Sequence, residues 1–329
     1  MIKTYPIDYP NGPSWLQKIK QPLLFQGWGK KSNYFEGWYY KVVDATQNIA
    51  YAVIPGVSLN DEDPHAFIQV IDGARQRSSY HRFDLSSFEC NPKKHYVRVG
   101  ESIFSEHLLQ VQLPDLTCSL TATQWSTLPY QWHRPGIMGW YAYIPTMQCN
   151  HGLGSMDHRW SGDLRLHNQT YSLKDADGYV EKDWGSSFPK SWIWTQCNTF
   201  EHPSPLCIFA SVAHIPWRGN HFIGFLGAIY IDGQIEIFST YTNAKRTTTI
   251  DDHQVTILYR KRNKFLKISA TKAPGAELIS PISGAMRGKV NESLLATVDI
   301  EYHDGVSTTI AKGSYAGLEI AGDYNELLT

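Results

Sequence analysis

Residues 179–198 read YVEKDWGSSFPKSWIWTQCN, and the second half of this stretch decides the fold class. From Ser191 onward most residues are aromatic, β-branched or small, a composition that favours β-strands over helices. Because successive side chains of a strand point to opposite faces, Trp192, Trp194 and Gln196 share one face. The stretch therefore predicts a strand that presents two indole rings on one side.

The same period of two places carboxyl groups beside aromatic rings. If the segment after Gly178 is extended, Glu181 and Asp183 share a face as they approach the Trp-rich strand. Near the N-terminus, Glu36 shares a strand face with Trp38. Acids among large aromatic side chains are unusual, because carboxylates are rarely buried without a partner. These three acids are our candidates for chemistry.

Strand signals continue along the whole chain. Short segments such as HAFIQVID (65–72) and QIEIFST (234–240) are aromatic or β-branched and are bounded by turn-forming residues. They recur about every 8–12 residues, as in sandwiches and barrels. Arg262–Asn263 is expected to be a turn between two such strands. No segment keeps a helical spacing of apolar residues over three turns, so we predict an all-β protein.

The chain of 329 residues is long for one hydrophobic core, so two domains are expected. FEGWYYKVVD (35–44) and PKSWIWTQCN (189–198) are similar, because each places an aromatic residue two positions after a Trp. We predict two related β domains, 1–176 and 177–329. The polar segment KDADG (174–178) is the expected linker.

Charge and composition exclude several classes. Thirty Lys and Arg balance 31 Asp and Glu without a basic block, which argues against a nucleic-acid partner. The five cysteines are widely spaced and outline neither a disulfide framework nor a zinc knuckle. The N-terminus resembles neither a signal nor a transit peptide, and no apolar run could span a bilayer. We expect a cytoplasmic protein with, at most, peripheral membrane contact.

Two interpretations of the three acids remain open at this stage. A carboxyl group in an apolar cavity resists ionisation and can donate a proton near neutral pH. Aromatic faces stabilise cations, so the combination suits protonation of an electron-rich alkene. Alternatively, the acids face solvent or pair with a cation such as Lys182 or Lys190.

Motifs for other chemistries are missing. His133, His151 and His158 lie near one another in sequence without the spacing of a metal-binding motif. The chain also lacks a G-x-S-x-G nucleophile motif and a glycine-rich nucleotide loop. We expect no metal and no cofactor.

Several motifs resemble the tocopherol cyclase family in that family's order and over most of the chain. They are YFEGWYYKVVD (34–44), HAFIQV (65–70), GIMGWYAYIPTMQCNHGLGSMDHRWSG (136–162), GYVEKDWGSSFPKSWIWTQCN (178–198) and SYAGLEIAG (314–322). The resemblance implies two lipocalin-like β domains in tandem, similar to carotenoid hydratases and certain fungal pericyclases. It also implies a prenylated hydroquinone substrate whose phenol closes onto its prenyl double bond to give a chromanol.

Together with the candidate acids, this resemblance leads to a mechanism without a redox step. Glu181 or Asp183, with Glu36 as second choice, would protonate the alkene, and the phenol oxygen would capture the cation. The residues expected to bind the substrate are Trp38, Tyr39, Trp184, Trp192, Trp194, Gln196 and His151. The alternatives are a hydratase or cyclase acting on another isoprenoid, or a carrier that binds an isoprenoid without catalysis.

Overall fold

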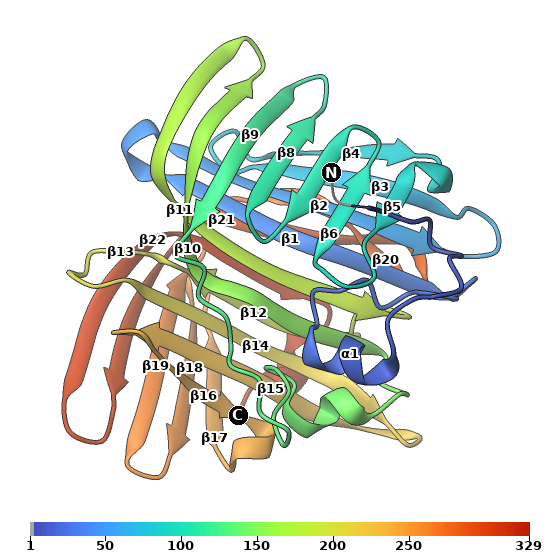
Figure 1. Ribbon diagram of the computed structural model, residues 1–329. Helices are drawn as coiled ribbons and strands as arrows, with labels where there is room; N and C mark the ends of the chain where they lie inside the picture. The colour runs from blue at the N-terminus through green and yellow to red at the C-terminus, as the bar shows by residue number, and fades with distance from the viewer. Residues whose placement is uncertain (1–2) are drawn as a thin grey trace.

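The structure, a computed structural model, describes residues 3–329, which form two antiparallel sheets of eleven strands each (Figure 1). The strands of the N-terminal sheet are β1 (Tyr34–Asp44), β2 (Ile49–Leu59), β3 (His65–Asp72), β4 (Arg77–Phe83), β5 (Phe88–Cys90), β6 (Tyr96–Val99), β7 (Ser102–Ser105), β8 (Leu108–Gln112), β9 (Leu116–Thr123), β10 (Cys149–Leu166) and β11 (Gln169–Gly185). Those of the C-terminal sheet are β12 (Trp192–Cys197), β13 (Thr199–Phe200), β14 (Leu206–Trp217), β15 (Asn220–Ile231), β16 (Gln234–Ser239), β17 (Lys245–Ile250), β18 (Gln254–Lys261), β19 (Lys264–Thr271), β20 (Ala276–Ile282), β21 (Ala285–His303) and β22 (Thr308–Ala321). The predicted turn at Arg262–Asn263 is confirmed between β18 and β19.

The helical elements are short. They are α1 (Trp15–Lys20) and the 3-10 turns η1 (Ala45–Gln47), η2 (Leu85–Ser87), η3 (Gly139–Tyr143), η4 (Thr240–Thr242) and η5 (Tyr324–Leu327). Sequence reasoning missed α1, which begins after Pro13 because Ser14 and Gln17 form a reciprocal capping box. Within residues 3–329, no helix has the length and apolar character needed to cross a bilayer.

The two sheets share one topology. Their strand orders are β4-β3-β2-β1-β11-β10-β9-β8-β7-β6-β5 and β16-β15-β14-β12-β22-β21-β19-β18-β17, with β13 and β20 paired to β22 and β21. The opening strand of each sheet, β1 or β12, therefore lies between the next long strand, β2 or β14, and the last long strand, β11 or β22. The two segments with a similar aromatic pattern thus occupy equivalent positions in their sheets. The predicted all-β class, with two lipocalin-like β units in tandem, is confirmed.

Alternation along the strands divides the apolar residues among three clusters. One cluster fills the N-terminal sheet and contains Trp38 and Val180, and a second fills the C-terminal sheet and contains Ile193. The third lies between the sheets and contains Tyr39 and Trp194. Neighbours in sequence thus belong to different clusters, as the period of two requires.

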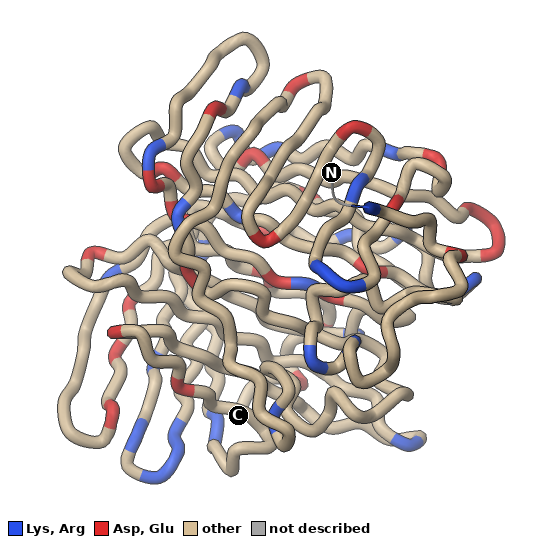
Figure 2. The backbone as a smooth tube through the Cα atoms, in the orientation of Figure 1, with Lys and Arg blue, Asp and Glu red and all other residues tan. Residues whose placement is uncertain are grey.

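The expected linker was wrong. KDADG (174–178) lies inside β11, which runs on to Gly185 as part of the N-terminal sheet. The division into 1–176 and 177–329 stays a prediction, although β11 spans its boundary. Charged residues are concentrated in loops and at strand ends (Figure 2), so the few acids inside the sheets stand out.

Candidate active site

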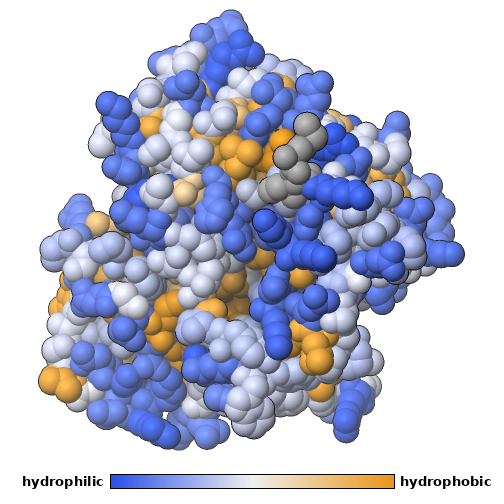
Figure 3. Space-filling model, in the orientation of Figure 1, coloured by the Kyte–Doolittle hydropathy of each residue, from blue (hydrophilic) through white to orange (hydrophobic). Residues whose placement is uncertain are grey.

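A cavity lies between the two sheets and is lined mainly by apolar side chains of the third cluster. Its aromatic walls include Phe35, Tyr39, Phe188, Trp192 and Trp194. Apolar side chains are visible where the two halves of the molecule meet (Figure 3). One histidine and four carboxyl side chains interrupt this apolar lining: His151, Glu181, Asp183, Glu292 and Glu319.

Glu181 of β11 faces the cavity because it alternates with Val180 and Lys182, which face the N-terminal core. Its carboxylate accepts hydrogen bonds from the Tyr179 hydroxyl at 2.5 Å and from the Trp194 indole N–H at 3.2 Å. Burial raises the pKa of Glu181 to about 7, although nearby His151 and these two donors oppose the shift. Glu181 is therefore a carboxyl group poised to exchange a proton near neutral pH.

Glu292 and Glu319 form a pair of acids on neighbouring strands. They are directly opposite in the register of β21 and β22. Burial, followed by the negative charge of Glu319, raises the pKa of Glu292 well above its usual range. Burial also raises the pKa of Glu319 to about 7. Two like charges in one apolar site resist simultaneous ionisation, which favours a shared proton on this pair.

Aromatic donors fix both members of this pair. The Tyr39 hydroxyl donates to Glu292 at 2.5 Å, and the Trp192 indole N–H donates to Glu319 at 2.6 Å. Gly317 of β22 leaves the space that Trp194 occupies, since a Cβ there would come within 2.5 Å of the indole ring. The aromatic walls and the acids thus form one hydrogen-bonded unit.

His151 of β10 supplies the positive charge of the site. Its Nδ1 lies 2.9 Å from Asp183 and its Nε2 lies 3.5 Å from Glu181. Burial lowers the pKa of His151, but the charges of Asp183 and Glu181 outweigh this effect and raise the pKa to about 9. At neutral pH the imidazolium therefore lies 2.9 Å from the Asp183 carboxyl group.

The structure corrects the expected position of Glu36. This residue is fully buried in the N-terminal half, where it forms a 2.5 Å ion pair with Lys182 and accepts hydrogen bonds from the Gln26 and Gly27 amides. Trp38 lies on the same side and donates its indole N–H to the Leu23 carbonyl at 2.9 Å. The cavity is on the opposite face of β1, so neither residue lines it.

Two further residues expected to bind the substrate lie outside the cavity. Trp184 is on the opposite face of β11 from Asp183 and packs against the N-terminal cluster, with the centre of its ring 4.6 Å from the Lys182 ammonium. Gln196 is on the Trp194 face but beyond the cavity, where it accepts a 2.8 Å hydrogen bond from the buried Lys41 ammonium. The other expected residues line the cavity: Tyr39, His151, Glu181, Asp183, Trp192 and Trp194.

Sequence reasoning missed Glu292 and Glu319. Glu319 lies in SYAGLEIAG (314–322), a motif used for the resemblance but not searched for acids. Glu292 follows Asn291 in a segment without aromatic neighbours, so a search for acids beside indoles could not find it. Only the pairing of β21 with β22 brings these two acids together.

Among residues 3–329, two groups of side chains have ligand atoms close enough to hold a metal ion. They are His151, Glu181 and Asp183 in the cavity, and His214, His221 and Glu326 at the C-terminal sheet. Within each group, one ligand atom per residue lies within 4.8 Å of the other two. In the cavity, the imidazolium of His151 already balances the charge of Asp183.

The fold and the site together define a class: tandem lipocalin-like β proteins with buried acids in an aromatic cavity between the two sheets. The model of the tocopherol cyclase-like family matches residues 121–322, and the chain belongs to this family. The resemblance inferred from the motifs is thereby confirmed.

Two curated relatives carry this family's name. The chain is 24% identical over 212 residues to a probable tocopherol cyclase, chloroplastic, of Oryza sativa subsp. japonica, a match that covers 60% of the chain and 43% of the relative. It is 25% identical over 122 residues to a tocopherol cyclase, chloroplastic, of Zea mays, covering 35% of the chain and 24% of the relative. The matches thus span less than half the length of these relatives.

Solved structures share the fold at low sequence identity. An AttH protein of Nitrosomonas europaea superposes with a TM-score of 0.53 at 13% identity, covering 96% of this chain and 99% of that one. CghA with Sch210972 gives 0.55 at 10% identity and 88% coverage of both chains. Kievitone hydratase from Nectria haematococca gives 0.50 at 10% identity, covering 98% of this chain and 97% of the other. At these identities the similarity concerns the fold alone.

Proposed function

We propose that this protein is a cofactor-independent cyclase that closes a prenylated hydroquinone to a chromanol. The observation that carries the proposal is the group of three buried acids with raised pKa values, Glu181, Glu292 and Glu319, on the wall of an aromatic cavity. The tocopherol cyclase-like family supports the choice of substrate class.

In the proposed reaction, neutral Glu181 donates its proton to the less substituted carbon of the prenyl double bond. The other alkene carbon becomes a tertiary cation, and the phenol oxygen attacks it to form the new C–O bond. The phenol proton then leaves and returns to the carboxylate. No electron acceptor is consumed, because substrate and product have the same composition.

Glu181 is the preferred donor because its conjugate base is stabilised in advance. When the proton leaves, the carboxylate keeps hydrogen bonds from Tyr179 and Trp194, and the His151 imidazolium lies 3.5 Å away. Fixed donors around a developing negative charge lower the barrier without reorganisation. The Glu292–Glu319 pair is proposed to keep its proton and to limit ionisation of the cavity.

The cavity walls suit the cation that this step produces. The faces of Trp192 and Trp194 stabilise positive charge by roughly 0.5–2 kcal/mol each, and the apolar lining keeps water from capturing the cation. Tyr39 and His151 are the polar side chains proposed to orient the phenol toward it.

Substrate delivery from a membrane surface fits the outside of the molecule. A second cleft shares Met138, Met147 and His151 with the cavity and extends to Trp15 of α1. Two segments that line this cleft, α1 and the connection between β9 and β10, carry exposed aromatic side chains: Trp15, Tyr130, Trp132 and Trp140. Such residues favour the membrane interface, so we propose peripheral contact there.

The test is incubation with a hydroquinone that carries a prenyl chain beside one hydroxyl, followed by chromatography and mass spectrometry. A cyclase gives a product of unchanged mass and altered retention, and in D2O the product gains one deuterium on carbon. Addition of one water would identify a hydratase, and recovery of bound, unchanged quinol would identify a carrier. Either of these outcomes would overturn the proposal.

A further inference from the structure

His214 and His221 lie on the same face of the β14–β15 hairpin. In the antiparallel register His214 is opposite Ile223 and Pro216 is opposite His221, so the two histidines are diagonal neighbours. Their rings are stacked, with centroids 4.2 Å apart and planes 20° from parallel. The pairing of β14 with β15 therefore holds the two rings next to each other.

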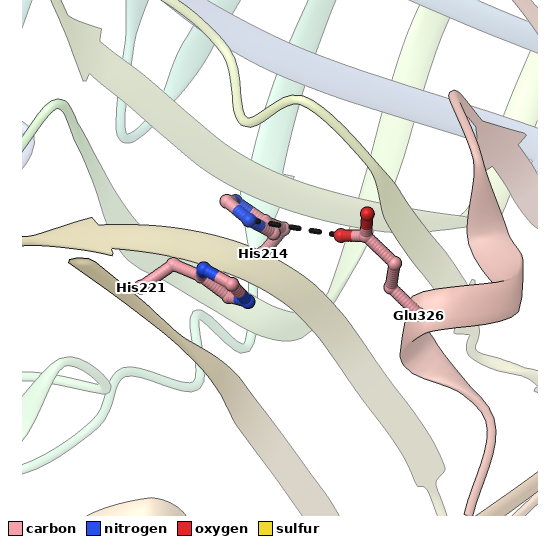
Figure 4. Close-up of side chains that lie close together, drawn as sticks. All are labelled: His214, His221 and Glu326. Carbon is pink, nitrogen blue, oxygen red and sulfur yellow. Dashed lines mark ion pairs between the residues drawn. The ribbon is translucent and has the colours of Figure 1, made fainter.

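A carboxylate from the end of the chain completes the group. Glu326 lies in η5, which packs against β12 and β14, and its Oε2 is 3.6 Å from Nε2 of His214 (Figure 4). One ligand atom from each of the three residues lies within 4.8 Å of the other two. The Nδ1 atom of His214 is buried and makes no hydrogen bond to residues 3–329. The nitrogen of His214 that approaches Glu326 is therefore Nε2, while Nδ1 is the ring nitrogen without a partner among the described residues.

We propose that His214, His221 and Glu326 bind a divalent transition-metal ion of the Zn2+ type. Two imidazoles and one carboxylate are a donor set that Zn2+ accepts, with water as the fourth ligand. Binding would turn the exposed His221 ring out of its stacked position, so that one nitrogen of each ring can direct its lone pair at the ion.

The metal would brace the wall of the cavity from behind. Ala213 and Ile215 of β14, and Phe222 and Gly224 of β15, line the cavity on the face opposite the two histidines. An ion held at this site ties the C-terminal turn η5 to the back of that hairpin. The site is separate from the proposed chemistry and does not depend on it.

Lys190 gives this proposal a sharp test. Its ammonium lies 2.9 Å from Oε1 of Glu326, and its side chain is 61% exposed, so it can swing away when an ion binds. Lys190 and a metal compete for the same carboxylate. Replacing Lys190 with Ala should therefore tighten metal binding, because the Glu326 carboxylate then has no competing ammonium group.

The experiment is titration of the tag-free full chain with Zn2+ in a calorimeter, with Co2+ absorption as a second readout of coordination. We expect one ion per chain. His214→Ala, His221→Ala and Glu326→Gln should each weaken binding by at least the roughly 10- to 100-fold that loss of a supporting partner costs. Lys190→Ala should strengthen it.

His253→Ala, at an exposed histidine outside the group, is the matched control and should leave binding unchanged. Circular dichroism of each variant checks that the fold is kept. Binding that persists in His221→Ala, or that follows His151→Ala instead, would overturn the proposal, as would weaker binding in Lys190→Ala.

Discussion

The two faces of the β1–β11 pair carry two kinds of buried acid. On the N-terminal face, Glu36 pairs with Lys182 and accepts hydrogen bonds from backbone amides. On the cavity face, Glu181 is the cross-strand neighbour of Tyr39 and meets only aromatic donors and His151. Both acids are buried beside tryptophan, yet only one faces a cavity.

Glu36 and Glu181 differ in the charged group beside them. Lys182 is held over the rings of Trp38 and Trp184, and it donates to the Pro22 and Leu24 carbonyls. Glu36 therefore completes a closed network of opposite charges. The cavity holds four carboxyl groups and one histidine, and this excess of acids favours the protonated form of some of them. We therefore expect raised carboxyl pKa values where buried acids outnumber the cations beside them, as in this cavity.

The largest expected effect is on turnover. Glu181→Gln keeps the shape and the hydrogen-bond acceptor but removes the proton that the alkene needs. We expect the rate of cyclisation to fall by about 10²–10⁴-fold, the usual contribution of a general acid. Steady-state kinetics with a prenylated hydroquinone measures it, and circular dichroism checks the fold. Full activity in Glu181→Gln, with loss in Glu292→Gln or Glu319→Gln, would move the donor role to the other pair.

For Glu36, the acid on the other face, we expect a loss of stability instead of a loss of turnover. Glu36→Gln leaves the Lys182 ammonium buried without its counter-ion, which costs about 3–5 kcal/mol in comparable pairs. Urea unfolding should register this loss, while Glu181→Gln, which replaces a largely neutral acid, should lose little. The double variant Glu36→Gln/Lys182→Met should recover much of the stability. A stable Glu36→Gln protein would show that this pair is not the closed network described above.

The period of two accounts for what could be predicted from sequence. It placed Glu181 and Asp183 together on one face, and Trp192 and Trp194 together on another. It could not tell which face of a strand meets which core, because both faces of β1 are buried. Glu36 and Trp38 were therefore assigned to the cavity when they belong to the N-terminal core.

The pairing of strands that are far apart in sequence is the second feature that could not be predicted. Glu292 and Glu319 are neighbours only because β21 and β22 pair, and nothing local marks Glu292 as buried. The ion pair of Glu36 with Lys182 is likewise a cross-strand contact between distant segments. Local patterns thus predicted the strands and part of the site, while the composition of the acid cluster depended on register.

The smallest expected effect is on the pH dependence of the free energy of unfolding, which differs between Glu181 on one face and Lys182 on the other. The pKa of Glu181 rises from a usual 4.5 to about 7 on folding, so the folded state binds the extra proton and its stabilising contribution is lost as pH rises through this window. Burial instead lowers the pKa of Lys182 to about 8, so its contribution changes only above that pH and with the opposite sign.

Between pH 5 and 7, Glu181→Gln should therefore gain stability relative to the wild-type chain, by up to about 1.4 kcal/mol per pH unit for one proton. The comparison of variant with wild type cancels the titration of buried groups that do not interact with Glu181, such as His95 and His158, whose pKa values burial lowers to about 3. Urea unfolding of both proteins at several pH values measures the difference. A difference that stays constant over this range would mean that Glu181 is already ionised in the folded protein, and the cavity would then resemble the Glu36–Lys182 network rather than a proton donor.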